Sequence, residues 1–343
     1  MRKHLKKGGG EYLRTTISDI ANMAKVSKST VSRFLNGGYV SAATAKKIQT
    51  AITETKFEPN SFAQSLKQKK TNFIGVIIPR LDSYTMTKML MGIDERLKEL
   101  GFQMLVANTD QVQEREIENI YAFSRQKVAG IILMATNITE EHNEAFEYAG
   151  IPTLVIGQES TNYHSIIHAD YEAGYDLGKF IYKNGHRKIL FLGVSEQDEA
   201  VGLKRKRGFM DALKDSGPHS VKALEADFSM ERARIETDKA LRVGIPDIIV
   251  CSTDNMALGA MKAIQEKNFT IPADLSVAGF GGYRISEMVH PGLTTVSFHY
   301  FDVGLNAAFS IVSLIEGKSV QKKMVSGYEI IRRESVAAIK SSN

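Results

Sequence analysis

The sequence lacks the features that mark several large classes of protein. Its 343 residues include one cysteine, Cys251, and no tryptophan. A single cysteine excludes an intramolecular disulfide framework and a multi-cysteine metal site. No apolar run reaches the roughly 18–20 residues that a membrane-spanning helix needs, and none follows the basic start of the chain as it would in a signal peptide. We therefore expect a cytoplasmic protein without a membrane segment.

Motifs for enzymatic chemistry are missing as well. Gly279-Phe280-Gly281 is followed by Arg284 at the position where a dinucleotide-binding fingerprint needs glycine, and the chain has no glycine-rich phosphate loop. The eight histidines show no metal-ligand spacing. Cys251 stands in an apolar run, which is typical of a core residue. We expect no enzymatic activity, no catalytic residue, no metal site and no cofactor.

Positive charge is concentrated at the start of the chain. Overall, 43% of residues are apolar and 24% are charged, which is typical of a folded soluble protein. Residues 1–70 hold 14 Lys and Arg but only four Asp and Glu, a net charge of +10, whereas the remainder carries −5. A basic head on a mildly acidic body predicts a polyanionic partner for the head alone.

Within this head, three short helices are expected after a flexible basic arm at residues 1–14. Thr16 can cap the first helix, and Ser27 can cap a second helix over residues 28–35. Asn36-Gly37-Gly38 ends that helix because glycine tolerates a left-handed backbone, and Ser41 can start the third. Two helices joined by a short turn, with a third closing the core, form a helix-turn-helix.

The outward face of the second helix suits the major groove of DNA. It carries Lys28, Ser29, Ser32 and Arg33. Arg33 can donate two hydrogen bonds to one guanine edge, and Lys28 and Ser29 stand at the end of the helix that first meets the bases. The sequence therefore predicts a DNA-reading helix.

These residues carry a resemblance to a known family. Residues 17–36, ISDIANMAKVSKSTVSRFLN, together with residues 40–41 and FEPN at 57–60, resemble the DNA-binding headpiece of the LacI/GalR family of bacterial repressors. The resemblance extends from Thr16 to about residue 338. It implies a homodimer on a pseudo-palindromic operator. The residues expected to contact DNA are Thr16, Ser27, Lys28, Ser29, Thr30, Ser32, Arg33, Asn36, Asn60, Ala63, Gln64, Leu66 and Lys67.

Residues 60–70 follow the headpiece, which spans 15–59. Asn60 can cap a helix of about two turns, which is too short to be stable alone in water. The resemblance implies that this segment is a hinge helix, two copies of which pair in the minor groove. There Leu66 would wedge between base pairs, as apolar side chains do in kinked DNA, and Ala63 would allow close helix–helix approach.

From residue 71 to 338 apolar strands alternate with amphipathic helices. This alternation predicts doubly wound parallel sheets, and its restart near residue 170 predicts two similar lobes with a ligand between them. The resemblance implies a core similar to periplasmic sugar-binding proteins. We expect the first lobe at 71–168 and 299–322, the second at 169–298 and 323–338, and a tail at 339–343.

The resemblance also suggests residues for an effector site. Arg205 matches an arginine that clamps sugar hydroxyls or a purine in the family, and Asp254 is either a helix N-cap or a sugar ligand. Gly281-Gly282 stands where the family commonly has an Asp-Asp pair. The missing carboxylate leaves room for a bulkier ligand, or for Tyr283 or Arg284 to substitute for it. The expected effector residues are Ser83, Tyr84, Thr85, Gln158, Asp198, Arg205, Thr253, Asp254, Gly281, Tyr283 and Phe298.

We therefore expect a transcriptional repressor of a sugar-utilisation operon that is released from its operator by a small sugar. Residues 62–66, 131–136, 166–171 and 191–195 resemble the branch of the family that regulates sucrose operons, so sucrose or a related fructose-containing sugar is the expected effector. Two alternatives stay open. One is a catabolite-control regulator with a phosphoprotein co-repressor, and the other is a sugar-binding protein that does not bind DNA.

Overall fold

The computed structural model describes residues 15–35, 37–57 and 71–339. The chain divides into two units, residues 1–71 and 72–343. The expected basic arm, the hinge segment at 60–70 and residues 340–343 of the tail lie outside the described residues. Each unit is considered by itself below.

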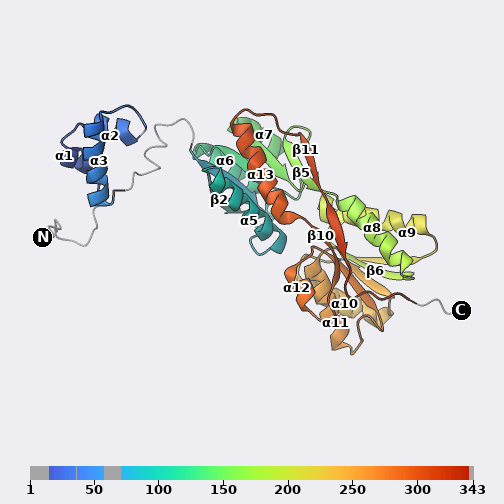
Figure 1. Ribbon diagram of the computed structural model, residues 1–343. Helices are drawn as coiled ribbons and strands as arrows, with labels where there is room; N and C mark the ends of the chain where they lie inside the picture. Colours follow the sequence, from blue (N-terminus) through green and yellow to red (C-terminus); the bar gives the residue numbers. More distant parts are fainter. Residues whose placement is uncertain (1–14, 36, 58–70, 340–343) are drawn as a thin grey trace. The chain divides into compact units, whose positions relative to one another are not determined.

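The first unit contains the three expected helices, α1 (Ile17–Ala24), α2 (Lys28–Leu35) and α3 (Ala42–Thr55) (Figure 1). Ile20, Val31 and Ile48, one from each helix, are fully buried and form the centre of the core. Ser41 caps α3, and Gly37 follows α2 with φ +72°, in the left-handed region expected there. The helix-turn-helix prediction is confirmed.

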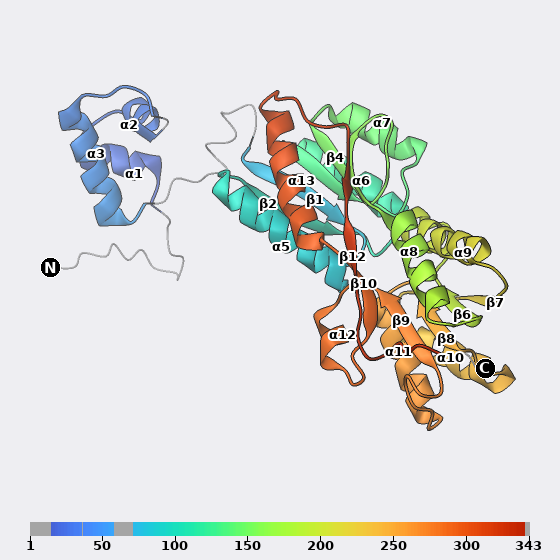
Figure 2. The same cartoon turned by 45° about the vertical axis from the view of Figure 1, so that its right-hand side comes forward.

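The second unit begins with a lobe built on a parallel sheet in the order β11-β5-β4-β3-β1-β2. The strands are β1 (Phe73–Ile78), β2 (Gln103–Asn108), β3 (Gly130–Met134), β4 (Thr153–Ile156), β5 (His164–His168) and β11 (Lys323–Ser326). The helices are α5 (Tyr84–Glu99), α6 (Gln113–Arg125), α7 (Glu140–Ala149) and α13 (Tyr300–Ile315). Helices α5 and α13 lie side by side (Figure 2), and α6 packs with α7.

The other lobe has the strand order β12-β10-β9-β8-β6-β7, and only β12 is antiparallel to its neighbour. The strands are β6 (Lys188–Gly193), β7 (Ser220–Glu225), β8 (Ile248–Cys251), β9 (Ser276–Phe280), β10 (Thr294–Phe298) and β12 (Tyr328–Ile331). The helices are α8 (Asp170–Lys183), η1 (Glu199–Lys204), α9 (Arg205–Ser216), α10 (Met230–Val243), α11 (Asp254–Glu266) and α12 (Arg284–Met288). Central strands such as β8 and β9 are buried along their whole length, as expected when helices cover both faces.

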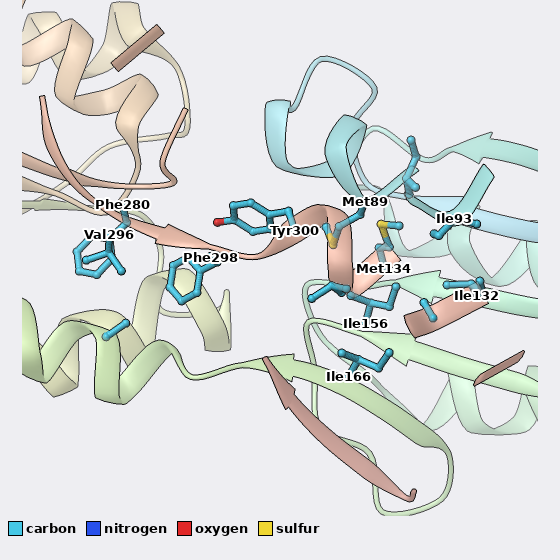
Figure 3. Packing of buried hydrophobic residues seen from close by; sticks show 14 of the residues in the cluster. Met89, Ile93, Ile132, Met134, Ile156, Ile166, Phe280, Val296, Phe298 and Tyr300 are labelled. Carbon is cyan, nitrogen blue, oxygen red and sulfur yellow. The ribbon is translucent and has the colours of Figure 1, made fainter. Parts of the chain in front are cut away.

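The chain passes between the lobes three times. It leaves the first lobe after β5, returns between β10 and α13, and leaves again between β11 and β12. The expected last crossing at residue 323 is therefore corrected to the position after Ser326, because β11 pairs with β5 in the first sheet. Figure 3 shows Phe298 and Tyr300 on the second passage, between the apolar groups of the two lobes. One continuous apolar cluster joins the lobes along these passages.

None of the helices in the described ranges is both long enough and apolar enough to span a membrane.

Candidate functional site

The outward surface of α2 presents the side chains that the sequence predicted. Lys28, Ser29 and Arg33 are exposed, whereas Val31 on the opposite side of the helix is fully buried. Within the described residues, neither Lys28 nor Arg33 forms an ion pair with a carboxylate. The exposed guanidinium of Arg33 can therefore donate to an anionic or hydrogen-bonding partner.

The hydroxyl residues expected at DNA also shape the helix ends. The Ser27 hydroxyl accepts a hydrogen bond from the Thr30 backbone N–H at 3.2 Å and contacts the Ser29 hydroxyl at 2.7 Å. Thr16 and Asp19 form a reciprocal capping box at the start of α1. Ser32 is half-buried on α2. The remaining predicted DNA contacts lie outside the described residues: Asn36, Asn60, Ala63, Gln64, Leu66 and Lys67.

In the second unit a cavity of about 120 Å³ lies between the two lobes. Its walls come from the segments that follow the carboxyl ends of the strands, where ligands of open α/β sheets bind. Seven of the eleven predicted effector residues line it: Ser83, Thr85, Gln158, Asp198, Arg205, Thr253 and Tyr283.

Arg205 is held rigidly at the floor of this cavity. Its Nε donates to Asp170 Oδ1 at 2.7 Å and its Nη1 donates to the Ser252 carbonyl at 2.9 Å. Both charged side chains are at least 95% buried. The guanidinium also lies 4.8 Å from the centre of the Phe298 ring. These contacts fix the plane of the donor fork, so Arg205 is a support of the fold as well as a wall of the cavity.

Asp254 is not the N-cap of α11, and it is not among the residues that line the cavity. Thr253 is the N-cap of α11, and its hydroxyl accepts from the Met256 N–H at 3.3 Å. The Asp254 carboxylate is fully buried and accepts hydrogen bonds from Tyr283 N, Ser286 Oγ and Thr295 Oγ1 at 2.9, 2.8 and 2.5 Å. Because these donors occupy it, Asp254 organises the loop after β9 and does not line the cavity.

Three other predicted residues support the cavity from outside its wall. Phe298 packs beneath Arg205, and the Tyr84 ring packs against the Tyr283 ring with centroids 4.5 Å apart. Gly281 has φ +145°, a conformation that residues with a Cβ rarely adopt. These residues shape the site through their neighbours.

The structure adds lining residues that the sequence reasoning missed. Among them are Arg80, Gln111, His168, Phe228 and Tyr300. His168 ends β5, and Arg80 follows the carboxyl end of β1, so their positions next to predicted strand ends are a signal that the sequence contains. Phe228 lies in the connection between β7 and α10, and no local pattern marks it.

Of the titratable side chains that line the cavity, His168 is neutral and Arg80 is already paired. Burial lowers the pKa of His168 to about 4, so its imidazole is neutral at pH 7, and its Nδ1 has no hydrogen-bond partner. Arg80 pairs with the exposed carboxylate of Asp82 through two contacts of 2.9 and 3.0 Å. Burial raises the pKa of Asp198.

Acceptor atoms remain in this cavity for a ligand that donates hydrogen bonds. Gln158 donates from Nε2 to the Thr136 carbonyl at 2.7 Å, while its buried Oε1 has no partner. Apolar side chains such as Met134 and Phe280 form much of the remaining wall. A few convergent polar groups on an apolar wall suit a small uncharged or weakly charged polar ligand. In the described ranges, no cluster of three or more His, Cys, Asp or Glu is arranged to hold a metal ion.

Comparisons with known proteins agree with this geometry. The family described as bacterial regulatory proteins, lacI family, matches residues 16–60. The family described as periplasmic binding proteins and sugar binding domain of LacI family matches residues 71–334. The chain is similar to the sucrose operon repressor of Staphylococcus xylosus, with 35% identity over 90% of this chain and 96% of the relative. It is also similar to catabolite control protein A of Priestia megaterium, with 31% identity over 91% and 96%.

Among solved structures, the chain is similar to the lac repressor dimer bound to operator and the anti-inducer ONPF. The TM-score is 0.85 at 25% identity, and the match covers 95% of this chain and 100% of that one.

Proposed function

Because the chain belongs to the LacI family of bacterial regulatory proteins, which are DNA-binding transcriptional repressors, we propose that it represses a sugar-utilisation operon and leaves its operator when a sugar binds between the lobes. One observation carries the proposal. The same chain combines an exposed basic reading face on α2 with an interlobe cavity that holds a fixed arginine and unpartnered acceptors.

The proposed DNA target is a pseudo-palindromic operator bound by a homodimer. One helix-turn-helix reads one half-site, so two copies related by two-fold symmetry read two half-sites. The lac repressor, which the chain resembles in fold, is described as a dimer bound to operator. Arg33 supplies base discrimination through its fork, and Lys28 and Ser29 add contacts at the amino end of the same helix.

The proposed effector is sucrose or a related fructose-containing sugar. The name of the Staphylococcus xylosus relative supports this choice, and the cavity chemistry is compatible with it. Sugar hydroxyls donate hydrogen bonds, and Gln158 Oε1 and the Asp198 carboxylate can accept them. Arg205 donates from a fixed position because Asp170 and the Ser252 carbonyl hold its guanidinium.

Release of DNA then depends on a shift between lobe arrangements. A sugar that contacts both lobes favours the arrangement in which those contacts exist, and it shifts the equilibrium only by its difference in affinity for the two arrangements. Two of the three passages between the lobes carry packed rings: His168 lies on the first, and Phe298 and Tyr300 lie on the second. The centroids of these three rings are 5.1–5.8 Å apart. Because these rings pack together where the chain passes between the lobes, we propose that the passages act as the hinge for this movement.

A catabolite-control regulator with a phosphoprotein co-repressor is the second candidate, since catabolite control protein A is 31% identical. The two candidates differ in what changes DNA affinity. In the first, a sugar alone weakens operator binding. In the second, a phosphoprotein strengthens it.

Selection of DNA from a random pool, followed by gel shift and a sugar panel, tests the proposal. We expect the full chain to select a pseudo-palindrome, to sediment as a dimer, and to release that DNA with sucrose or fructose. A chain that binds a sugar but selects no DNA would instead support the sugar-binding protein that does not bind DNA. If no sugar in the panel weakens operator binding, the proposed release by a sugar is wrong.

A further inference from the structure

The loop after β9 contains two glycines that the structure requires. Gly281 and Gly282 have φ values of +145° and +62°. A Cβ on Gly281 would lie 2.3 Å from the ring of Tyr283, and a Cβ on Gly282 would lie 2.3 Å from the Ser297 hydroxyl oxygen. Two aspartates at these positions would displace both neighbours. The glycines therefore allow the chain to fold Tyr283 back against the loop.

Tyr283 is anchored in this position. Its backbone N–H donates to the buried Asp254 carboxylate at 2.9 Å, and the residue is only 6% exposed. It lines the cavity, whereas Arg284, the next residue, is exposed and does not. Of the two residues that can substitute for the missing carboxylate, only Tyr283 reaches the cavity.

The ring of Tyr283 also connects the two lobes. It packs against Tyr84, the first residue of α5 in the other lobe, with ring centroids 4.5 Å apart and planes inclined by 34°. A second contact spans the lobes nearby, where the Arg80 guanidinium lies 5.7 Å from the Phe228 ring. Tyr283 therefore borders the cavity, belongs to the second lobe and packs ring against ring on the first lobe.

We propose that Tyr283 selects the ligand at this end of the cavity and couples its binding to lobe closure through Tyr84. The inference rests on the sugar-binding function proposed above. A carboxylate accepts from two hydroxyls, whereas a neutral phenol donates one hydrogen bond and accepts another. The site therefore favours a sugar that presents a single hydroxyl or an ether oxygen here, with an apolar ring face toward the Tyr283 ring.

The absence of tryptophan from the chain allows a specific optical test. Tyr84→Trp places a single tryptophan at the contact between the lobes, and excitation that is selective for tryptophan reports on that contact alone. In this background, Tyr283→Phe keeps the ring and removes the hydroxyl, Tyr283→Ala removes both, and Gly281→Ala displaces a tyrosine that is still present. Tyr148→Ala, at a tyrosine that is 73% exposed on α7, is the matched control.

Without sugar, we expect Tyr283→Phe to keep the emission spectrum, and Tyr283→Ala and Gly281→Ala to shift it alike. With sucrose or fructose as the titrant, Tyr283→Phe should weaken binding by about 2- to 10-fold, as for loss of one neutral hydrogen bond. Tyr283→Ala should weaken it further because an aromatic contact contributes about another 2- to 10-fold. The Tyr148→Ala control should match its parent in both measurements.

Two results would overturn the inference. One is a Tyr283→Phe variant that binds sugar like its parent, and the other is an emission spectrum that Tyr283→Ala leaves unchanged. If no sugar binds the wild-type chain, the proposed function itself fails, and the selecting role fails with it. If Gly281→Ala does not fold, as circular dichroism would show, the two Tyr283 variants still decide the question.

Discussion

Replacing Arg205 with alanine should destabilise the second unit strongly, because the change breaks a buried ion pair. The variant leaves the Asp170 carboxylate, which is 2% exposed, without its cation, and leaves the Ser252 carbonyl without its donor. Removing one partner of a buried pair costs about 3–5 kcal/mol. The packing of the guanidinium on Phe298 is lost as well. A residue used only to clamp a sugar would have no such cost.

A double-mutant cycle isolates the contribution of the pair. Arg205→Ala and Asp170→Ala should each lower the free energy of unfolding, and the double variant should lose less than the sum of the two by about 2–3 kcal/mol. Urea denaturation of the full chain, followed by far-UV circular dichroism at pH 7, measures these values. Operator binding should be compared only under conditions in which each variant is folded.

The matched control is Arg242→Ala on α10. Arg242 pairs with Asp238 at 2.8 Å, but its side chain is 71% exposed. Surface pairs contribute about 0–1 kcal/mol, so this variant should differ little from wild type. If Arg205→Ala costs no more than Arg242→Ala, or if the cycle is additive, Arg205 does not support the fold and its role is limited to the ligand.

Three further predictions concern DNA reading and titration. Arg33→Ala should reduce discrimination between operator and random DNA by about 1–3 kcal/mol per half-site, as measured by competition in fluorescence anisotropy; an unchanged ratio would mean that α2 is not the reading helix. Burial lowers the pKa of His168 to about 4, so between about pH 6.5 and pH 4 the unfolded chain binds a proton at this residue and the folded chain does not. The free energy of unfolding should therefore fall by up to about 3 kcal/mol as the pH drops below about 6.5. His168→Phe should reduce this pH dependence in urea titrations. Burial raises the pKa of Asp198, so the folded state favours the protonated carboxyl, and stability falls as pH rises above the ordinary carboxyl pKa. Asp198→Asn should therefore stabilise the chain more at pH 7 than at pH 4, and an equal effect at both pH values would contradict this.

The parts of the structure that local sequence patterns determine were predictable. Thr16 and Ser41 cap their helices as expected, because capping depends on residues within one turn. The strand–helix alternation predicted both sheets, since buried parallel strands read as continuous apolar runs. Strand β11 gave no such signal, because its residues alternate between exposed and half-buried at the edge of the sheet. The last crossing was therefore placed before it.

The cavity was predictable where residues follow strand ends and unpredictable where distant segments meet. Adjacent Thr253 and Asp254 are both good capping residues, and only backbone geometry shows that Thr253 caps α11. The partners of Asp254 come from positions 29 to 41 residues away, so its role in holding the loop after β9 has no local signature. Phe228 reaches the cavity for the same reason, through tertiary packing that no short pattern encodes.

We propose that sugar binding between the lobes and operator binding by the headpiece are coupled. The most direct measurement is a pair of titrations on the full-length chain. One gives the operator dissociation constant with and without saturating sucrose, and the other gives the sucrose dissociation constant with and without the operator. Linkage requires the two ratios to be equal. We expect each ligand to weaken binding of the other by the same factor, which for typical coupling is about 5- to 150-fold. If both ligands bind and neither dissociation constant changes when the other ligand is present, the proposed coupling is wrong.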